Sequence, residues 1–222
     1  MAEALVNEYL EAGRQRGDTI MESRALNMLG NVASNRRKIP QAEKFYRSAL
    51  ALAKASGNLS LEAFALGNLG ETACTSGDYA AARDYALIAL ERTRDLGDMW
   101  NIIVSVNNLS MAYLKLGEMS AVRQLMMREA LPIIRSTDAP PLKVWAVSFS
   151  ARIRVAEKEL DRALALFGLI RKHPRLLPAN KIDIEEGLAQ IDLPPEQIES
   201  GLAAGASLDF DEVIQEILDG KW

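Results

Sequence analysis

A forty-residue period runs through most of the sequence and constrains its fold more than any other feature. One set of marks recurs at this spacing: Gly17-Asp18, Gly57-Asn58, Gly97-Asp98 and Thr137-Asp138. A second set divides each unit near its middle: Arg37, Gly77 and Gly117. Because glycines with polar neighbours end helices and form turns, each unit is predicted to contain two helices. Stacked units of this length bury a continuous core between neighbours, which favours a helical solenoid.

The segments between these marks have the pattern of amphipathic helices. They are about 15 to 18 residues long, contain almost no proline, and carry apolar or small residues at positions i, i+3, i+4 and i+7. Leu66, Leu69, Gly70 and Ala73 are one example. No room is left for β-strands, so we expect an all-α protein.

Glycines inside these helices need a packing reason, since glycine destabilises a helix interior by about 0.5–1 kcal/mol relative to alanine. Gly30 and Gly70 stand forty residues apart. We expect them where the two helices of a unit cross closely, because a larger side chain would hold the helices apart. The GNLG stretch that contains Gly70 is not a phosphate-binding loop, because no strand precedes it and no GK[ST] follows it.

Composition excludes several classes of protein. The net charge is −4, and the one tight basic cluster is residues 36–38, so no broad nucleic-acid footprint is present. Cys74 is the single cysteine, which removes an intramolecular disulfide framework and any multi-cysteine metal site. No run of about 18 apolar residues predicts a membrane span. We therefore expect a cytoplasmic protein that has no cofactor or metal and does not bind nucleic acid or membrane.

The small residues at fixed spacings, the apolar residue after each internal turn and the turn between units resemble the tetratricopeptide repeat in its forty-residue form. The resemblance covers about residues 2–172 and is strongest in the units that start near Thr19 and Leu59. In the unit near Met99, Ser110 replaces the glycine, and Val122 and Glu129 take the alanine places. The next pair fits only with one inserted residue, which gives Ala151, Ala163 and Ile170. The resemblance implies a right-handed superhelical solenoid.

The two ends of the chain differ from the full repeats. Residues 2–17 align with the second helix of the next unit, so the sequence begins halfway through a repeat, as a fragment of a longer protein or as a cap. We expect a solenoid over residues 1–175, with this half repeat and about four helix pairs. Residues 176–222 are predicted to form a helical cap of three short helices, with Asp209 and Glu212 as a capping pair. This tail also resembles the C-terminal end of bacterial signal-transduction ATPases and transcriptional regulators.

In the tetratricopeptide-repeat family, ligands usually bind on the concave face, which the first helix of each pair lines. Transferring the repeat register gives the residues expected on that face: Arg24, Asn27, Asn31, Asn35, Phe64, Asn68, Glu71, Asn107, Asn108, Met111, Lys115, Trp145, Phe149 and Arg152. Asn68 and Asn108 are equivalent across units. An asparagine amide has two donors and an acceptor, so it can bind the backbone of an extended peptide.

The family also contains clamps for the C-terminal carboxylate of chaperones, which use lysines and an arginine on this face. Asn27, Val104 and Asn108 stand at those places, so such a clamp is not expected. His173 is the single histidine and has no nucleophile pattern around it, so no catalytic residue is predicted. We expect a non-catalytic module that binds a peptide or partner domain. The alternatives are an effector-sensing arm of an ATP-dependent regulator and self-association through the half repeat.

Overall fold

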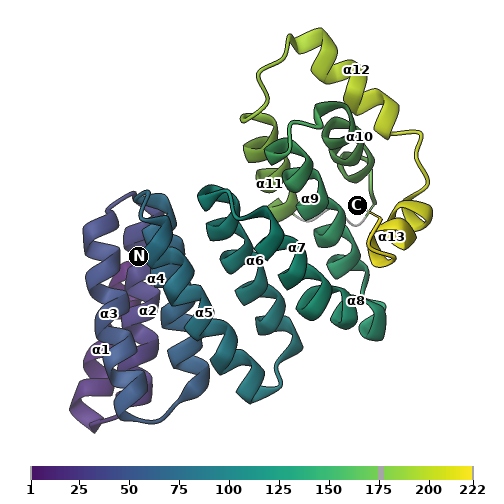
Figure 1. Ribbon diagram of the computed structural model, residues 1–222. Coiled ribbons are helices and arrows are strands. Elements are labelled where there is room, and N and C mark those ends of the chain that lie inside the picture. Colours follow the sequence, from purple (N-terminus) through teal and green to yellow (C-terminus); the bar gives the residue numbers. More distant parts are fainter. Residues whose placement is uncertain (1, 175–177, 222) are drawn as a thin grey trace. The chain divides into compact units, whose positions relative to one another are not determined.

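The computed structural model describes residues 2–174 and 178–221, and within these ranges every regular element is helical (Figure 1). The expected all-α fold of successive helix pairs is confirmed. Contacts between Cα atoms divide the chain into two compact units, Met1–Ala130 and Leu131–Trp222. The division into a solenoid over residues 1–175 and a cap over 176–222 stays a prediction.

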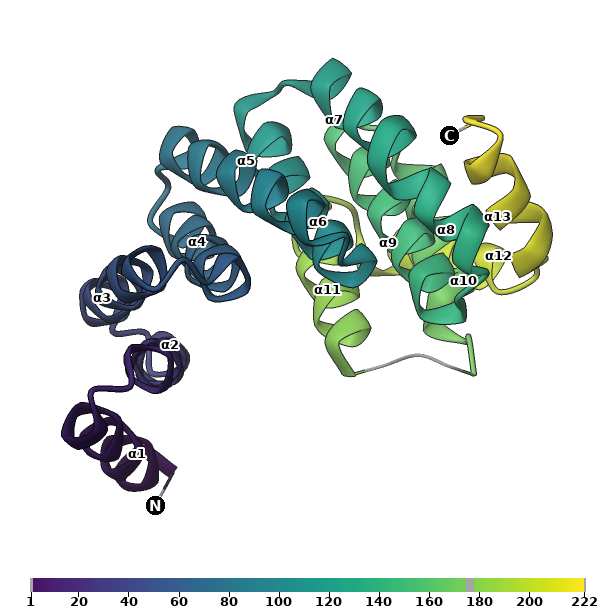
Figure 2. The ribbon, with the colours of Figure 1, turned by 90° about the horizontal axis from the view of Figure 1, so that it is seen from below.

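The first unit is a stack of antiparallel helices that follow one another in sequence. Each helix packs against the next, and Figure 2 shows several of them nearly end-on, lying side by side. The elements are α1 (Ala2–Arg16), α2 (Thr19–Asn35), α3 (Ile39–Ala55), α4 (Leu59–Thr75), α5 (Tyr79–Leu96), α6 (Met99–Leu116), α7 (Met119–Leu125) and the π-helix η1 (Met126–Ala130). The apolar residues of each helix bury themselves between its two neighbours, as the repeat pattern predicts.

Residues with a left-handed backbone conformation end the helices at the turns predicted from the sequence. The backbone φ is positive at Gly17, Arg37, Gly57, Gly77, Gly97 and Gly117. Glycine adopts this conformation without the steric cost that a side chain brings, and it ends a helix cleanly. The following residue then caps the next helix in four of these turns: the side chains of Asp18, Asn58, Asp78 and Asp98 each accept a hydrogen bond from the backbone N–H three residues later. The marks are thus local stop signals for one helix, and in these four turns they are also start signals for the next.

The π-helix η1 adds one residue to the repeat, and this shifts two positions relative to those predicted from the sequence. A π-helix contains one residue more than an α-helix over the same rise. Consequently Ala130, and not Glu129, occupies the fully buried place that alanine takes in the earlier units. The left-handed residue of the next turn is Asp138 rather than Thr137, and that of the following turn is Lys158. The predicted insertion of one residue is therefore accommodated inside a helix and not in a loop.

The two repeat glycines differ in how closely the neighbouring helix approaches. A methyl group on Gly30 would come within 2.8 Å of the Tyr46 ring at Cζ and closer still to two other ring carbons. Tyr46 is buried, so the ring has no free space to move into. At Gly70 the nearest atom to such a methyl would be the Ala82 carbonyl oxygen at 3.4 Å, an ordinary contact. Close crossing therefore requires glycine at position 30, whereas alanine would fit at position 70.

The second unit contains α8 (Leu131–Thr137), α9 (Pro140–Ala156), α10 (Leu160–Arg171), α11 (Pro178–Leu188), α12 (Pro195–Gly205) and α13 (Phe210–Leu218). The three tail helices do not form another repeat: α12 packs against α10, while α11 and α13 pack against α9. The capping pair is confirmed, because the Asp209 side chain accepts a hydrogen bond from the Glu212 N–H. Gly205 is the last residue of α12.

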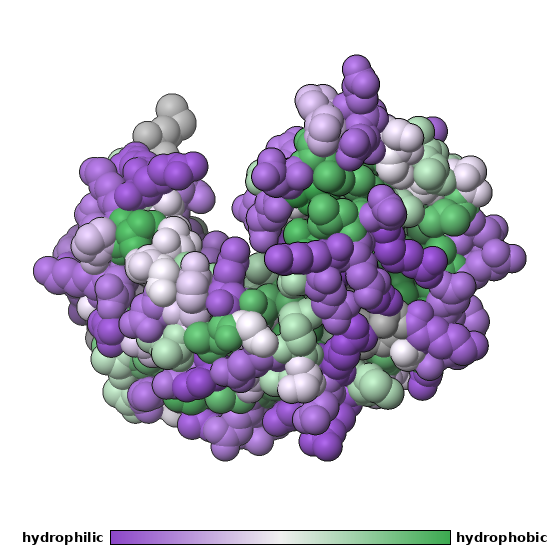
Figure 3. Space-filling view, turned by 45° about the horizontal axis from the view of Figure 1, so that its top comes forward, coloured by the Kyte–Doolittle hydropathy of each residue, from purple (hydrophilic) through white to green (hydrophobic). Residues whose placement is uncertain are grey.

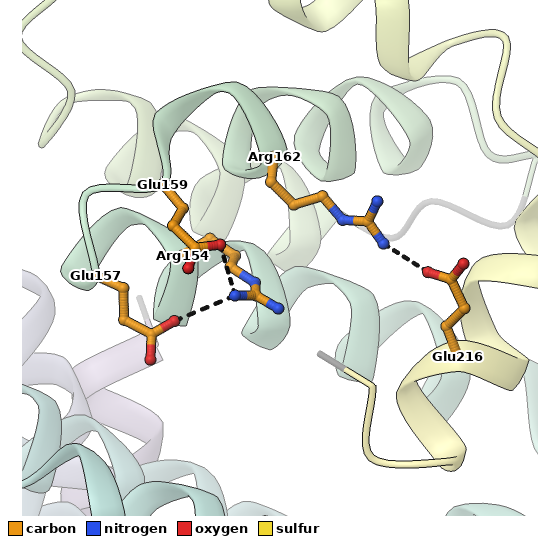
Figure 4. Close-up of polar contacts among 5 residues, drawn as sticks. All are labelled: Arg154, Glu157, Glu159, Arg162 and Glu216. Carbon is orange, nitrogen blue, oxygen red and sulfur yellow. Dashed lines mark hydrogen bonds and ion pairs between the residues drawn. The ribbon is translucent and has the colours of Figure 1, made fainter.

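Glycines and ion pairs fix these tail helices. A methyl on Gly168 of α10 would meet the Leu202 backbone, with its Cα at 2.9 Å, and one on Gly205 would meet the Ala165 backbone, with its Cα at 2.7 Å. The helices α10 and α12 thus cross backbone to backbone. Figure 4 shows the pair that links α10 to α13, Arg162 Nη2 with Glu216 Oε2 at 2.5 Å. It also shows Arg154 of α9 between two glutamates of the following turn.

Candidate functional site

The first helices of the repeats form one continuous face in the first unit. Helix α2 packs against α4, and α4 packs against α6, in addition to the contacts between consecutive helices. We call the accessible side of α2, α4 and α6 the inner face. The space-filling view in Figure 3 shows one side of the protein, on which hydrophobic side chains form separate patches between hydrophilic ones.

A groove with a volume of about 150 Å³ opens on the inner face between α4 and α6, and we call it the α4–α6 groove. Its lining comprises Ala63, Phe64, Gly67, Asn68, Glu71, Thr93, Asn101, Val104, Ser105 and Asn108. Phe64 and Val104 hold equivalent places in the two helices and are 54% and 43% exposed. Four of the residues in the sequence-based list meet here, Phe64, Asn68, Glu71 and Asn108, together with Val104, which the sequence places on the same face at an expected lysine position.

The asparagines of the inner face are partly used in contacts between repeats. Asn68 Nδ2 donates to Asn27 Oδ1 at 3.3 Å, and Asn27 Nδ2 donates to the Ser23 carbonyl oxygen, also at 3.3 Å. Asn27 is buried, so it supports Asn68 instead of facing solvent. Asn107 Nδ2 lies 3.5 Å from Asn108 Oδ1. Asn68 and Asn108 are half-buried, and both line the groove.

Asn31 has a structural contact as well as an exposed position. Its Oδ1 accepts a hydrogen bond from the Tyr46 hydroxyl at 2.8 Å. The pKa of Tyr46 is raised to about 12, chiefly by burial and also by the negative charge of Glu71, while a hydrogen bond with Ser34 lowers it. Glu71 therefore lies close enough to the Tyr46–Asn31 pair to affect its electrostatics. The Tyr46 phenol therefore stays protonated at neutral pH.

The remaining predicted residues of the first unit lie outside the groove. Arg24 and Asn35 of α2 and Lys115 of α6 are exposed, whereas Met111 is half-buried. Sequence reasoning missed five lining residues: Ala63, Gly67, Thr93, Asn101 and Ser105. Gly67 could have been noticed, because it occupies the place that asparagine takes in both neighbouring units, at Asn27 and Asn107. The small side chains at these positions create the hollow.

In the second unit the predicted face of α9 is largely covered. Phe149 is only 1% exposed and stacks on Trp145 with the ring centroids 5.4 Å apart, so the expectation that it points to an open surface is wrong. Arg152 pairs with Glu186 of α11 at 3.3 Å. The physical reason is that α11 packs against α9, a contact that the repeat pattern does not encode. Trp145 and Arg152 remain half-buried.

Within the described ranges, no group of three or more histidine, cysteine, aspartate or glutamate side chains could hold a metal ion. In the same part of the chain, each helix is too short or too polar to cross a membrane.

Residues 21–95 match the family model described as tetratricopeptide repeat. Among solved structures, the crystal structure of BtubC (BKLC) from P. vanneervenii is similar to this chain, with a TM-score of 0.65 and 16% sequence identity. The alignment covers 99% of this chain and 91% of that one, and at this identity it supports the fold alone. No curated protein matches the sequence. Residues 21–95 therefore resemble tetratricopeptide repeats, which generally mediate protein–protein interactions.

Proposed function

We propose that this chain is a non-catalytic interaction module that binds an extended peptide segment of a partner protein in the α4–α6 groove. One observation carries the proposal: Asn68 and Asn108, at equivalent places in α4 and α6, line the same groove as the exposed side chains of Phe64 and Val104. Amides can bind a peptide backbone whatever its sequence, while apolar surfaces bind its side chains. The tetratricopeptide-repeat match supports a protein partner in general.

The test is the double substitution Asn68→Ala with Asn108→Ala. A display library of random linear peptides, selected on the wild-type protein, supplies the probe, and fluorescence anisotropy gives its Kd. We expect the double variant to bind at least about tenfold more weakly, or about 1.4 kcal/mol. The control is Asn7→Ala, an exposed asparagine of α1. An unchanged Kd in the double variant would refute the role of the two amides.

The regulatory alternative, an effector-sensing arm of an ATP-dependent regulator, is expected to have a deep apolar pocket near Phe64, Trp145 and Phe149. The burial of Phe149 speaks against this arrangement, because the ring is already packed in the core of the second unit. The groove that contains Phe64 is lined by amides and a carboxylate as well as apolar groups. We therefore retain peptide binding as the proposed function.

The half repeat supports a second candidate, self-association through α1. Leu5 is 61% and Tyr9 37% exposed, whereas Ala49, which is equivalent to Tyr9, is fully buried in α3. A helix of a second copy would cover these side chains. Sedimentation equilibrium tests this idea, with Leu5→Lys as the disrupting variant. A monomer mass that does not change with concentration would remove it.

A further inference from the structure

We infer that the α4–α6 groove selects a peptide segment in which an aliphatic side chain lies near a lysine or arginine, an inference that rests on the proposed function. Three features of the groove carry it: its size, its glycine floor and its single charge. Each is independent of the two asparagines that would hold the peptide backbone.

The size of the groove fits one side chain. Pockets for drug-sized ligands are typically about 300–1,000 Å³, whereas this groove is about 150 Å³. Phe64 and Val104 offer apolar walls, and Ala63 contributes a methyl group. An aliphatic side chain would remove these exposed apolar surfaces from water.

Gly67 keeps the groove open without being required by the packing of the helices. A methyl group built on Gly67 would meet only Asn108 Nδ2, at 3.7 Å, an ordinary van der Waals distance. This differs from Gly30, where the Tyr46 ring leaves no room. Glycine destabilises a helix interior, so its presence in mid-α4 is not explained by folding. A larger residue here would fill the hollow in which the ligand side chain is placed.

The charge of the groove favours a cation in the ligand. Glu71 is the only ionisable residue in the lining, and no lysine or arginine of the described residues forms an ion pair with its carboxylate. A basic side chain of a bound segment would supply the missing counter-charge, while an acidic one would be repelled. The same charge argues against a ligand that presents a terminal carboxylate at this point.

The experiment starts from the display selection on the wild-type protein and uses the selected peptide itself as the probe. Replacing its aliphatic residue by alanine should weaken binding about tenfold, and replacing its basic residue by glutamine about threefold, as expected for a partly exposed ion pair. On the protein, Gly67→Leu should abolish the preference for the aliphatic residue, and Glu71→Gln should abolish only the preference for the basic one. Ala51→Leu on the outer side of α3 and Glu8→Gln on α1 are the matched controls.

The outcomes separate this inference from the proposed function. If Gly67→Leu and Glu71→Gln remove the two preferences independently, the inference holds. The inference is overturned, and the proposed function stands, if peptides bind through Asn68 and Asn108 but show no aliphatic and basic residues. The same holds if the Kd of a selected peptide does not change in Glu71→Gln. If no peptide is selected, or binding ignores the asparagines, the proposed function fails with it. The substitutions in the peptide keep the test valid even if Gly67→Leu does not fold.

Discussion

The crossing of α10 and α12 provides a sharp test of how the tail is held. In a Gly168→Ala variant, the new methyl carbon would lie 2.9 Å from the Leu202 Cα and would also press on the Leu202 carbonyl group. Carbon atoms prefer a separation of about 3.5–4.0 Å, so the helices must move apart by about 1 Å. Backbone atoms cannot rotate away as a side chain does. Overpacking of this kind costs about 1–3 kcal/mol, and the gain in helix propensity offsets about 0.5–1 kcal/mol of it.

We therefore expect Gly168→Ala to lower the free energy of unfolding by about 1–2 kcal/mol. Urea unfolding followed by circular dichroism measures this change, and hydrogen exchange measures whether the α12 amides lose protection. The matched control is Gly67→Ala, since its methyl has ordinary contacts and should stabilise the protein by about 0.5–1 kcal/mol. The reasoning is refuted if Gly168→Ala is as stable as the wild type and α12 keeps its protection.

Three further predictions concern the first unit. The pKa of Tyr46 is raised from 10.0 to about 12 in the folded state, so the stability that the neutral phenol contributes is complete below pH 10 and is lost as the pH rises toward 12. The free energy of unfolding in urea should therefore fall by roughly 2 to 3 kcal/mol over this range. This fall should be absent in Tyr46→Phe and retained in a Tyr79→Phe control. Asp98→Ala removes the side-chain acceptor for the Asn101 N–H and should cost about 1 kcal/mol in the same assay, against no change for Asp84→Ala. Glu62→Ala leaves Arg92 without its buried partner at 3.0 Å, whereas Glu43→Ala breaks an exposed pair. The first variant should therefore lower the free energy of unfolding more than the second. Equal losses of unfolding free energy in the two variants would contradict the role of burial.

Local features of the sequence were enough to determine the repeat architecture. A glycine followed by aspartate or asparagine both ends one helix and caps the next, because left-handed backbone and side-chain capping depend on a few adjacent residues. The spacing of apolar and small residues then defines which side of each helix is buried. The helix pairs, their turns and the equivalent places of Asn68 and Asn108 on two first helices could therefore be predicted from the chain alone.

Other features depend on contacts between residues that are far apart in the sequence. The position of the extra residue is one case: the sequence shows that an insertion is needed, but only the burial of Ala130 places it in η1. The burial of Phe149 is another, since it follows from α11 packing on α9. The groove itself arises where Gly67 of α4, which has no side chain, lies beside Asn108 of α6. Periodicity reports which side of a helix is buried, whereas a cavity or a covered face depends on which distant side chains meet there, and that is decided only when the helices pack.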